Sequence, residues 1–191
     1  MKTFLKLLLA LSIISLIACD KSAKQQDIND STSKLNQPEL INYAENGDIN
    51  KIKELLFSGN KVNTLDSCQW SPLMKAAQYG HYDVVDLLLH QGANIEQADK
   101  GDYTALLLAT SRNHANIVEL LIKNGAKINH QESSMGWTAL IWATKLDYVE
   151  TVKILLSNKA QRNLKDLQGN TALAWAKKIK SQNLINLLQN I

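Results

Sequence analysis

The sequence is poor in the residues that carry catalysis, metal binding and covalent cross-linking. Its 191 residues include two cysteines, two prolines and four histidines. His90 and His130 have no cysteine or carboxylate at a spacing typical of zinc sites, and no glycine-rich phosphate-binding pattern occurs. No nucleophile stands in a recognisable pattern with a base. We therefore expect no catalytic residue, no metal and no cofactor, and we interpret the protein as a non-enzyme.

A strong excess of one charge is also missing. The chain has 21 basic and 18 acidic residues, and a product that begins at Cys19 loses Lys2 and Lys6. The densest basic cluster is Lys177, Lys178 and Lys180, which is typical of a solvated helix face rather than a nucleic-acid interface. We expect no nucleic-acid partner.

No hydrophobic run is long enough to cross a bilayer. The longest, Leu7 to Ile17, is about half of the roughly 20 residues that a membrane-spanning helix needs. It follows Lys2 and Lys6, and a short apolar run after a basic start is typical of a signal peptide. Residues 1–18 are therefore predicted to be a signal peptide.

The end of this segment, Leu16-Ile17-Ala18-Cys19, resembles the lipobox of bacterial lipoproteins. The resemblance implies that Cys19 is lipidated and becomes the mature N-terminus, and more than one acyl chain gives lasting anchorage. Asp20 resembles the signal for retention at the inner membrane in lipoproteins of enterobacterial type. We expect a lipid-anchored protein on the periplasmic side of a bacterial cell envelope, at the inner membrane.

A polar segment follows the predicted lipidation site. Residues 19–37 are rich in Lys, Asp, Ser, Gln and Asn and have only scattered apolar residues. Such a composition cannot bury enough apolar surface to fold alone. We predict that residues 19–37 form a flexible, disordered tether.

From residue 38 onward the chain repeats itself. Related segments begin at Ser71, Thr104, Thr138 and Thr171, at spacings of 33, 34 and 33 residues, and the segment from Leu40 aligns one period earlier. A fixed period in this range indicates stacked repeats. One domain, 38–191, is predicted, with repeats near 38–65, 66–98, 99–131, 132–165 and 166–191.

Each repeat reads as two short helices. Ser71 supplies a hydroxyl that can cap a helix, and Pro72 occupies the first turn, where its missing N–H has no cost. Gly80 can end this helix, and a second helix carries apolar residues at helical spacing as far as Gly92. No repeat has enough apolar surface to fold alone, so the core must form by stacking.

These motifs resemble the ankyrin repeat, whose pattern is D-x-x-G-x-T-P-L-H-x-A-A-x-x-G-H with a trailing L-L-x-x-G-A. The second repeat keeps Asp66, Pro72, Leu73, Ala76, Ala77, Gly80, His81, Gly92 and Ala93. The W-x-x-L-G-x-x-Y pattern of tetratricopeptide repeats is absent. The resemblance implies an all-α, ankyrin-type solenoid of about five helix-turn-helix repeats joined by β-hairpin-like fingers. The usual histidine after the leucine is replaced by Met74, Leu107, Ile141 and Ala174.

Ankyrin-like stacks bind partners with a concave side made of the finger tips and the exposed face of each first helix. Trp70, Tyr103 and Trp137 occupy the same finger position in successive repeats, and aromatic residues are enriched at interface centres. We expect an exposed aromatic row here; the alternative is that these rings pack on neighbouring fingers. The other predicted contact residues are Tyr79, Arg112, Met135, Lys145 and Leu146. Trp142 and Trp175 are expected mainly to pack.

Two functional hypotheses follow. The first is a membrane-anchored periplasmic module, expected to be a monomer, that holds or regulates a partner protein of the cell envelope through its concave face. The alternative is an immunity-type inhibitor that neutralises a cell-envelope toxin such as a lipase, because small ankyrin-like lipoproteins resemble such inhibitors.

Overall fold

The computed structural model describes residues 38–189, which fold into ten helices. The predicted signal peptide, Cys19 and the tether lie outside the described residues. In chain order, the helices are α2 Glu39–Asn46, α3 Ile49–Phe57, α4 Pro72–Tyr79, α5 Tyr82–His90, α6 Ala105–Ser111, α7 Ala115–Lys123, α8 Ala139–Lys145, α9 Val149–Ser157, α10 Ala172–Ile179 and α11 Gln182–Gln189. None of the helices between residues 38 and 189 is long and apolar enough to cross a membrane.

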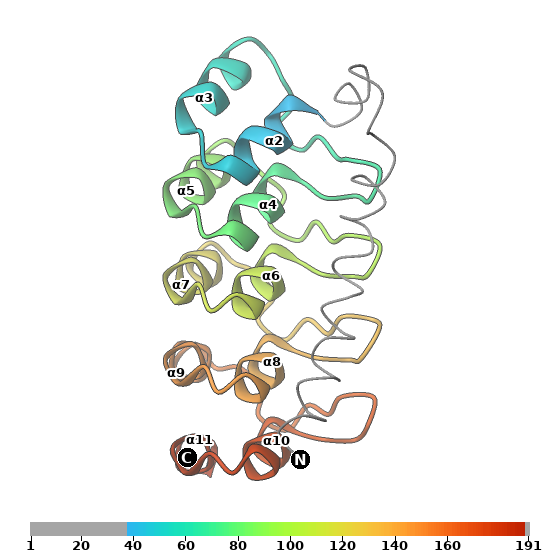
Figure 1. The fold of residues 1–191 in the computed structure, drawn as a ribbon, viewed down its shortest axis with the longest axis vertical. Helices are drawn as coiled ribbons and strands as arrows, with labels where there is room; N and C mark the ends of the chain where they lie inside the picture. Colours follow the sequence, from blue (N-terminus) through green and yellow to red (C-terminus); the bar gives the residue numbers. More distant parts are fainter. Residues whose placement is uncertain (1–37, 190–191) are drawn as a thin grey trace, which may run out of the picture. The chain divides into compact units, whose positions relative to one another are not determined.

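The helices stack as five antiparallel pairs. Helices α2, α4, α6, α8 and α10 form one layer, each packed on the next, and α3, α5, α7, α9 and α11 form the other (Figure 1). Extended fingers project beside the first layer and connect successive pairs (Figure 1). Within residues 38–189 the fingers hold an isolated bridge, between Ala98 and Thr104, and no named strand. The predicted all-α solenoid with hairpin-like fingers is confirmed.

The first helix of each complete repeat begins at a hydroxyl cap. Ser71 Oγ accepts a hydrogen bond from Met74 N at 3.2 Å, and Thr138 Oγ1 accepts one from Ile141 N at the same distance. Helix α4 ends at Gly80, whose φ of 86° is in the left-handed region that glycine favours. The corresponding left-handed position in the third repeat is Asn113, with φ of 61°. The repeat spacing in the sequence thus corresponds to helix starts and ends that recur in each repeat.

Histidines tie neighbouring repeats together. His81 Nε2 lies 2.8 Å from the carbonyl oxygen of Glu45, and its ring lies so close to Gly47 that a Cβ there would meet Nδ1 at 2.5 Å. His114 makes the same contacts one repeat later, with the carbonyl oxygen of Gln78 at 3.1 Å. Each histidine therefore requires the glycine one repeat earlier, and its role is structural.

Apolar side chains replace the histidine of the family pattern inside the first helices. Met74, Leu107 and Ile141 are each at most 1% exposed. These side chains cannot form hydrogen bonds, and apolar burial, worth about 1.5–3 kcal/mol per large side chain, stabilises the stack instead.

Candidate protein-binding face

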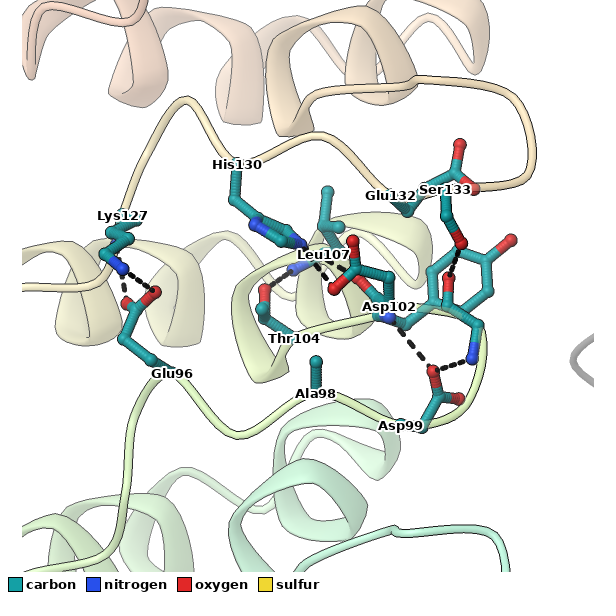
Figure 2. Close-up of polar contacts among 12 residues, drawn as sticks. Glu96, Ala98, Asp99, Asp102, Thr104, Leu107, Lys127, His130, Glu132 and Ser133 are labelled. Carbon is teal, nitrogen blue, oxygen red and sulfur yellow. Dashed lines mark hydrogen bonds and ion pairs between the residues drawn. The ribbon is translucent and has the colours of Figure 1, made fainter.

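A carboxylate, half-buried or buried, organises each finger. Asp99 Oδ1 accepts hydrogen bonds from Gly101 N at 2.8 Å and Tyr103 N at 3.0 Å (Figure 2). Burial raises the pKa of the Asp99 carboxyl, while these hydrogen bonds act in the opposite direction. Asp66 and Asp166 hold their fingers in the same way. The geometry of each finger is thus fixed by one acidic residue at its start.

The finger of the fourth repeat uses a glutamate because it is one residue longer. Glu132 is 1% exposed, and its two carboxylate oxygens accept hydrogen bonds from the backbone nitrogens of Ser134, Met135 and Trp137. The longer side chain reaches across the additional residue. The inserted residue is visible in the sequence. The acidic residue at the start of this finger could have indicated that Glu132 binds the finger backbone.

Neighbouring fingers also bond to one another. Ser133 Oγ donates to the carbonyl oxygen of Gly101 at 3.3 Å, and Leu167 N donates to the carbonyl oxygen of Met135 at 2.9 Å. His130 Nε2 lies 2.9 Å from the carbonyl oxygen of Asp102 (Figure 2). The fingers therefore form a connected edge of the domain rather than independent loops.

The predicted row of exposed aromatic rings is wrong. Trp70, Tyr103 and Trp137 are only 4%, 3% and 3% exposed. The physical reason is the finger carboxylate, which bonds to the backbone N–H of each of these residues at the base of the finger. The ring is thereby held against the first helices instead of at the finger tip. Of the two readings open from the sequence, packing describes these rings.

Three of the buried rings, those of Tyr103, Trp137 and Trp142, form a connected cluster. The centroid of the Trp142 ring lies 5.6 Å from that of Tyr103 and 5.4 Å from that of Trp137, the latter in an edge-on arrangement. Trp175 Nε1 donates to Asp166 Oδ2 at 2.7 Å. The expectation that Trp142 and Trp175 mainly pack is confirmed, since both are buried. The contact between Tyr103 and Trp142 links the finger of the third repeat to the first helix of the fourth.

Lysines cover the rings on the first-helix side. The Nζ atom of Lys75 lies 4.7 Å from the centroid of Trp70, and that of Lys178 lies 4.5 Å from the centroid of Trp175. Lys145 Nζ lies 4.4 Å from the centroid of Trp137 and 3.1 Å from that of Trp175. We define Lys145, Lys178, Trp137 and Trp175 as the lysine–tryptophan cluster. Sequence reasoning predicted Lys145 but missed Lys75.

The environment of Lys145 disfavours its charge. The pKa of this ammonium group is lowered to about 8, mainly by burial and also by Lys178, while the nearby Asp166 acts in the opposite direction. No carboxylate oxygen between residues 38 and 189 lies within 4.0 Å of Lys145 Nζ. Lys145 is thus a half-buried cation that faces two tryptophan rings without an ion pair in this part of the chain.

The other predicted contact residues are more accessible than the rings. Tyr79 is 43% exposed and lies beside Lys75, whose Nζ is 5.9 Å from its ring centroid. Arg112 is exposed, and Leu146 is half-buried; they are the C-caps of α6 and α8. Met135 is half-buried in the finger of the fourth repeat. The predicted set therefore spreads along the first helices, with Lys145 and Trp137 brought into contact.

A model of ankyrin repeats, three copies long, matches residues 40–132 and 129–190. The chain belongs to the ankyrin-repeat family. Curated proteins that we compared gave no match to the sequence. Ankyrin repeats are protein-interaction modules, so a protein partner is expected for this ankyrin domain.

The described part of the ankyrin domain offers no evident metal site. No group of three or more His, Cys, Asp or Glu residues suited to hold a metal ion occurs within residues 38–189. The finger carboxylates instead bond to backbone N–H groups, as Asp99 and Glu132 show. The lysines of this face lie over aromatic rings.

Proposed function

We propose that this protein is a membrane-anchored periplasmic ankyrin module that holds or regulates a partner protein through its first helices and fingers. The observation that carries the proposal is the lysine–tryptophan cluster, in which Lys145 lies over Trp137 and Trp175 without a carboxylate partner in the described chain. A half-desolvated cation on a rigid aromatic platform can gain more from a partner's anion than a fully solvated lysine can.

The rigidity of the face supports binding. Its rings are buried, its fingers are bonded to one another, and its helices are capped. A surface that is ordered before it meets a partner loses less conformational entropy on association. Recognition by this face therefore rests on exposed residues, such as Tyr79 and Arg112, around a fixed base.

The test is capture of the partner by the full chain in cells. We would crosslink in the periplasm and compare the wild type with Lys145→Glu/Lys178→Glu. A matched control is Lys53→Glu/Lys159→Glu, which makes the same change of net charge at exposed positions in α3 and after α9. Capture lost in the first variant and kept in the second supports the proposal. Equal capture by both would remove Lys145 and Lys178 from the binding site.

The identity of the captured protein separates the two functions. An envelope toxin, such as a lipase that loses activity when bound, would establish the immunity-type inhibitor. A protein resident in the same cell, with no toxic activity, would establish the holding or regulating role.

The proposed lipid anchor at Cys19 has its own test. Cys19→Ser should abolish incorporation of labelled palmitate and release the protein from membranes. Cys68, the other cysteine, provides a competing chemistry, because a disulfide between Cys19 and Cys68 would leave no thiol for the lipid. A disulfide-linked peptide pair in the mature protein, or unchanged membrane fractionation of Cys19→Ser, contradicts the anchor.

A further inference from the structure

Charge is unevenly distributed along the ankyrin domain. Residues 38–66 contain three basic and five acidic side chains, whereas residues 138–189 contain eight basic and three acidic ones. Of the three acids at the C-terminal end, Asp166 is buried and bonded to Trp175 Nε1 and to finger N–H groups. The C-terminal repeats therefore present an excess of positive charge that their own carboxylates do not neutralise.

Two of these cations share one ring. Lys145 Nζ lies 3.1 Å and Lys178 Nζ 4.5 Å from the centroid of Trp175, so the two nitrogens cannot be more than 7.6 Å apart. Alternate residues of an extended strand are separated by about 6.6–6.8 Å and point to the same side. Carboxylates at alternate positions of one extended segment can therefore reach both lysines.

We propose that the lysine–tryptophan cluster binds an extended acidic segment of the partner protein, with carboxylates of alternate residues on Lys145 and Lys178. This inference rests on the proposed function, because it names the chemistry of the partner at the same face. Leu146 and Ile179, half-buried at the ends of α8 and α10, provide apolar surface for side chains between the acids.

At the N-terminal end of the face, a lysine over a tryptophan ring is already paired with a carboxylate of the domain. Lys75 lies over Trp70, and its Nζ is 3.1 Å from Glu45 Oε2, a carboxylate supplied by the preceding repeat. Lys145 has the ring contacts but no such carboxylate within the described chain. The pairing at Lys75 is thus an internal example of the contact that a partner's acid would make at Lys145.

The titration of Lys145 should make the affinity of the lysine–tryptophan cluster for carboxylates depend on pH. The charged groups that act on it are Asp166, which raises its pKa, and Lys178, which lowers it, with burial the largest cause of the value of about 8. Affinity for a carboxylate should therefore fall as pH rises above about 8, well before exposed lysines lose their charge near 10.4. An arginine at position 145 would keep its charge over this range.

The experiment measures binding of a fluorescein-labelled (Glu-Ser)4 peptide to the full chain by anisotropy at low salt. We expect Lys145→Met to weaken binding about tenfold, the equivalent of one charge-assisted hydrogen bond. Lys53→Met, with the same change of net charge on exposed α3, should bind within about twofold of the wild type. Lys145→Arg should retain binding at pH 7 and remove its decrease between pH 8 and 9.5.

Three results would overturn the proposal. They are equal loss in Lys145→Met and Lys53→Met, equal binding of a (Gln-Ser)4 peptide, and a preference for phosphatidylglycerol vesicles over the acidic peptide that depends on Lys145. The last would assign the cluster to membrane lipid instead of a protein. If peptide binding fails while cellular capture still depends on Lys145 and Lys178, the acidic segment is wrong and the proposed function stands.

Discussion

The two ends of the first-helix face use a lysine over a tryptophan in different ways. At the N-terminal end, Lys75 covers Trp70 and forms an ion pair with Glu45. At the C-terminal end, Lys145 covers Trp137 and Trp175, and no carboxylate of the described residues pairs with it. The charge of Lys75 is thus balanced by a carboxylate of the same domain. The charge of Lys145 has no such carboxylate among the described residues.

This difference separates stability from recognition. A buried ion pair whose partners are both present is self-contained, and removing one partner leaves an uncompensated charge. A half-buried cation without a partner carries a desolvation cost that a ligand can offset. The N-terminal lysine should therefore matter for folding and the C-terminal lysine for binding, and the following substitutions test that division.

The largest effect is expected from the rings beneath the lysines. Trp137→Ala and Trp70→Ala should each lower the free energy of unfolding by about 3–5 kcal/mol, because both side chains are almost fully buried. Tyr79→Ala, at an exposed position beside Lys75, should change it by less than about 0.5 kcal/mol. Urea titration followed by circular dichroism measures all three. A decrease in the free energy of unfolding of less than about 1 kcal/mol for either tryptophan variant would indicate that the rings are exposed, as predicted from the sequence.

Breaking the N-terminal ion pair should have the next largest effect. Glu45→Gln removes the anion beside Lys75, which is 5% exposed, and should destabilise the domain by about 1–3 kcal/mol. Glu54→Gln is the matched control, since Glu54 pairs with Lys51 on an exposed helix surface and such pairs contribute about 0.3–0.5 kcal/mol. Equal effects in the two variants would show that Glu45 does not stabilise the buried Lys75. The proposed difference between Lys75 and Lys145 would then be wrong.

The sequence predicted the solenoid well because its determinants recur locally. Hydroxyl caps such as Ser71, turn residues such as Gly80 and the buried alanines return at a fixed spacing, and each acts within a few residues. The direction of the Trp70 ring is not local in this sense. It depends on the carboxylate of Asp66 and on packing against the first helices, so the period located the residue but not its burial.

The partners of the lysines could not be predicted from the sequence either. Lys75 meets Glu45 from the preceding repeat, and Lys145 meets Trp175 from the following one. Residues about 30 apart become neighbours only when the repeats stack, and no single repeat shows which cation receives an anion. The residue-by-residue alignment predicted Lys145 as a contact residue, yet the feature that distinguishes it from Lys75 exists only in the stacked domain.

Removing the C-terminal charge should have a smaller effect, of opposite sign. Lys145→Met keeps the length of the side chain and eliminates a charge whose desolvation lowers its pKa to about 8. Partial exposure, together with attraction to the two rings, offsets much of that cost. We expect the free energy of unfolding at pH 7 to rise by about 1 kcal/mol. A decrease like that of Glu45→Gln, measured by the same urea titration, would mean that Lys145 stabilises the fold as Lys75 does.

The smallest expected effect is the pH dependence of that gain. The pKa of Lys145 in the folded state is below its value in the unfolded chain, so the unfolded state binds more protons between about pH 8 and 10.5 and stability rises with pH in this window. The difference in unfolding free energy between Lys145→Met and the wild type should therefore shrink from about 1 kcal/mol at pH 7 to near zero by about pH 10. Taking this difference cancels the titration of the other lysines and tyrosines. Lys53→Met, at an exposed position of α3 and with the same change of net charge, is the matched control. A flat difference for Lys145→Met would place Lys145 among the solvated lysines and remove its distinction from Lys75.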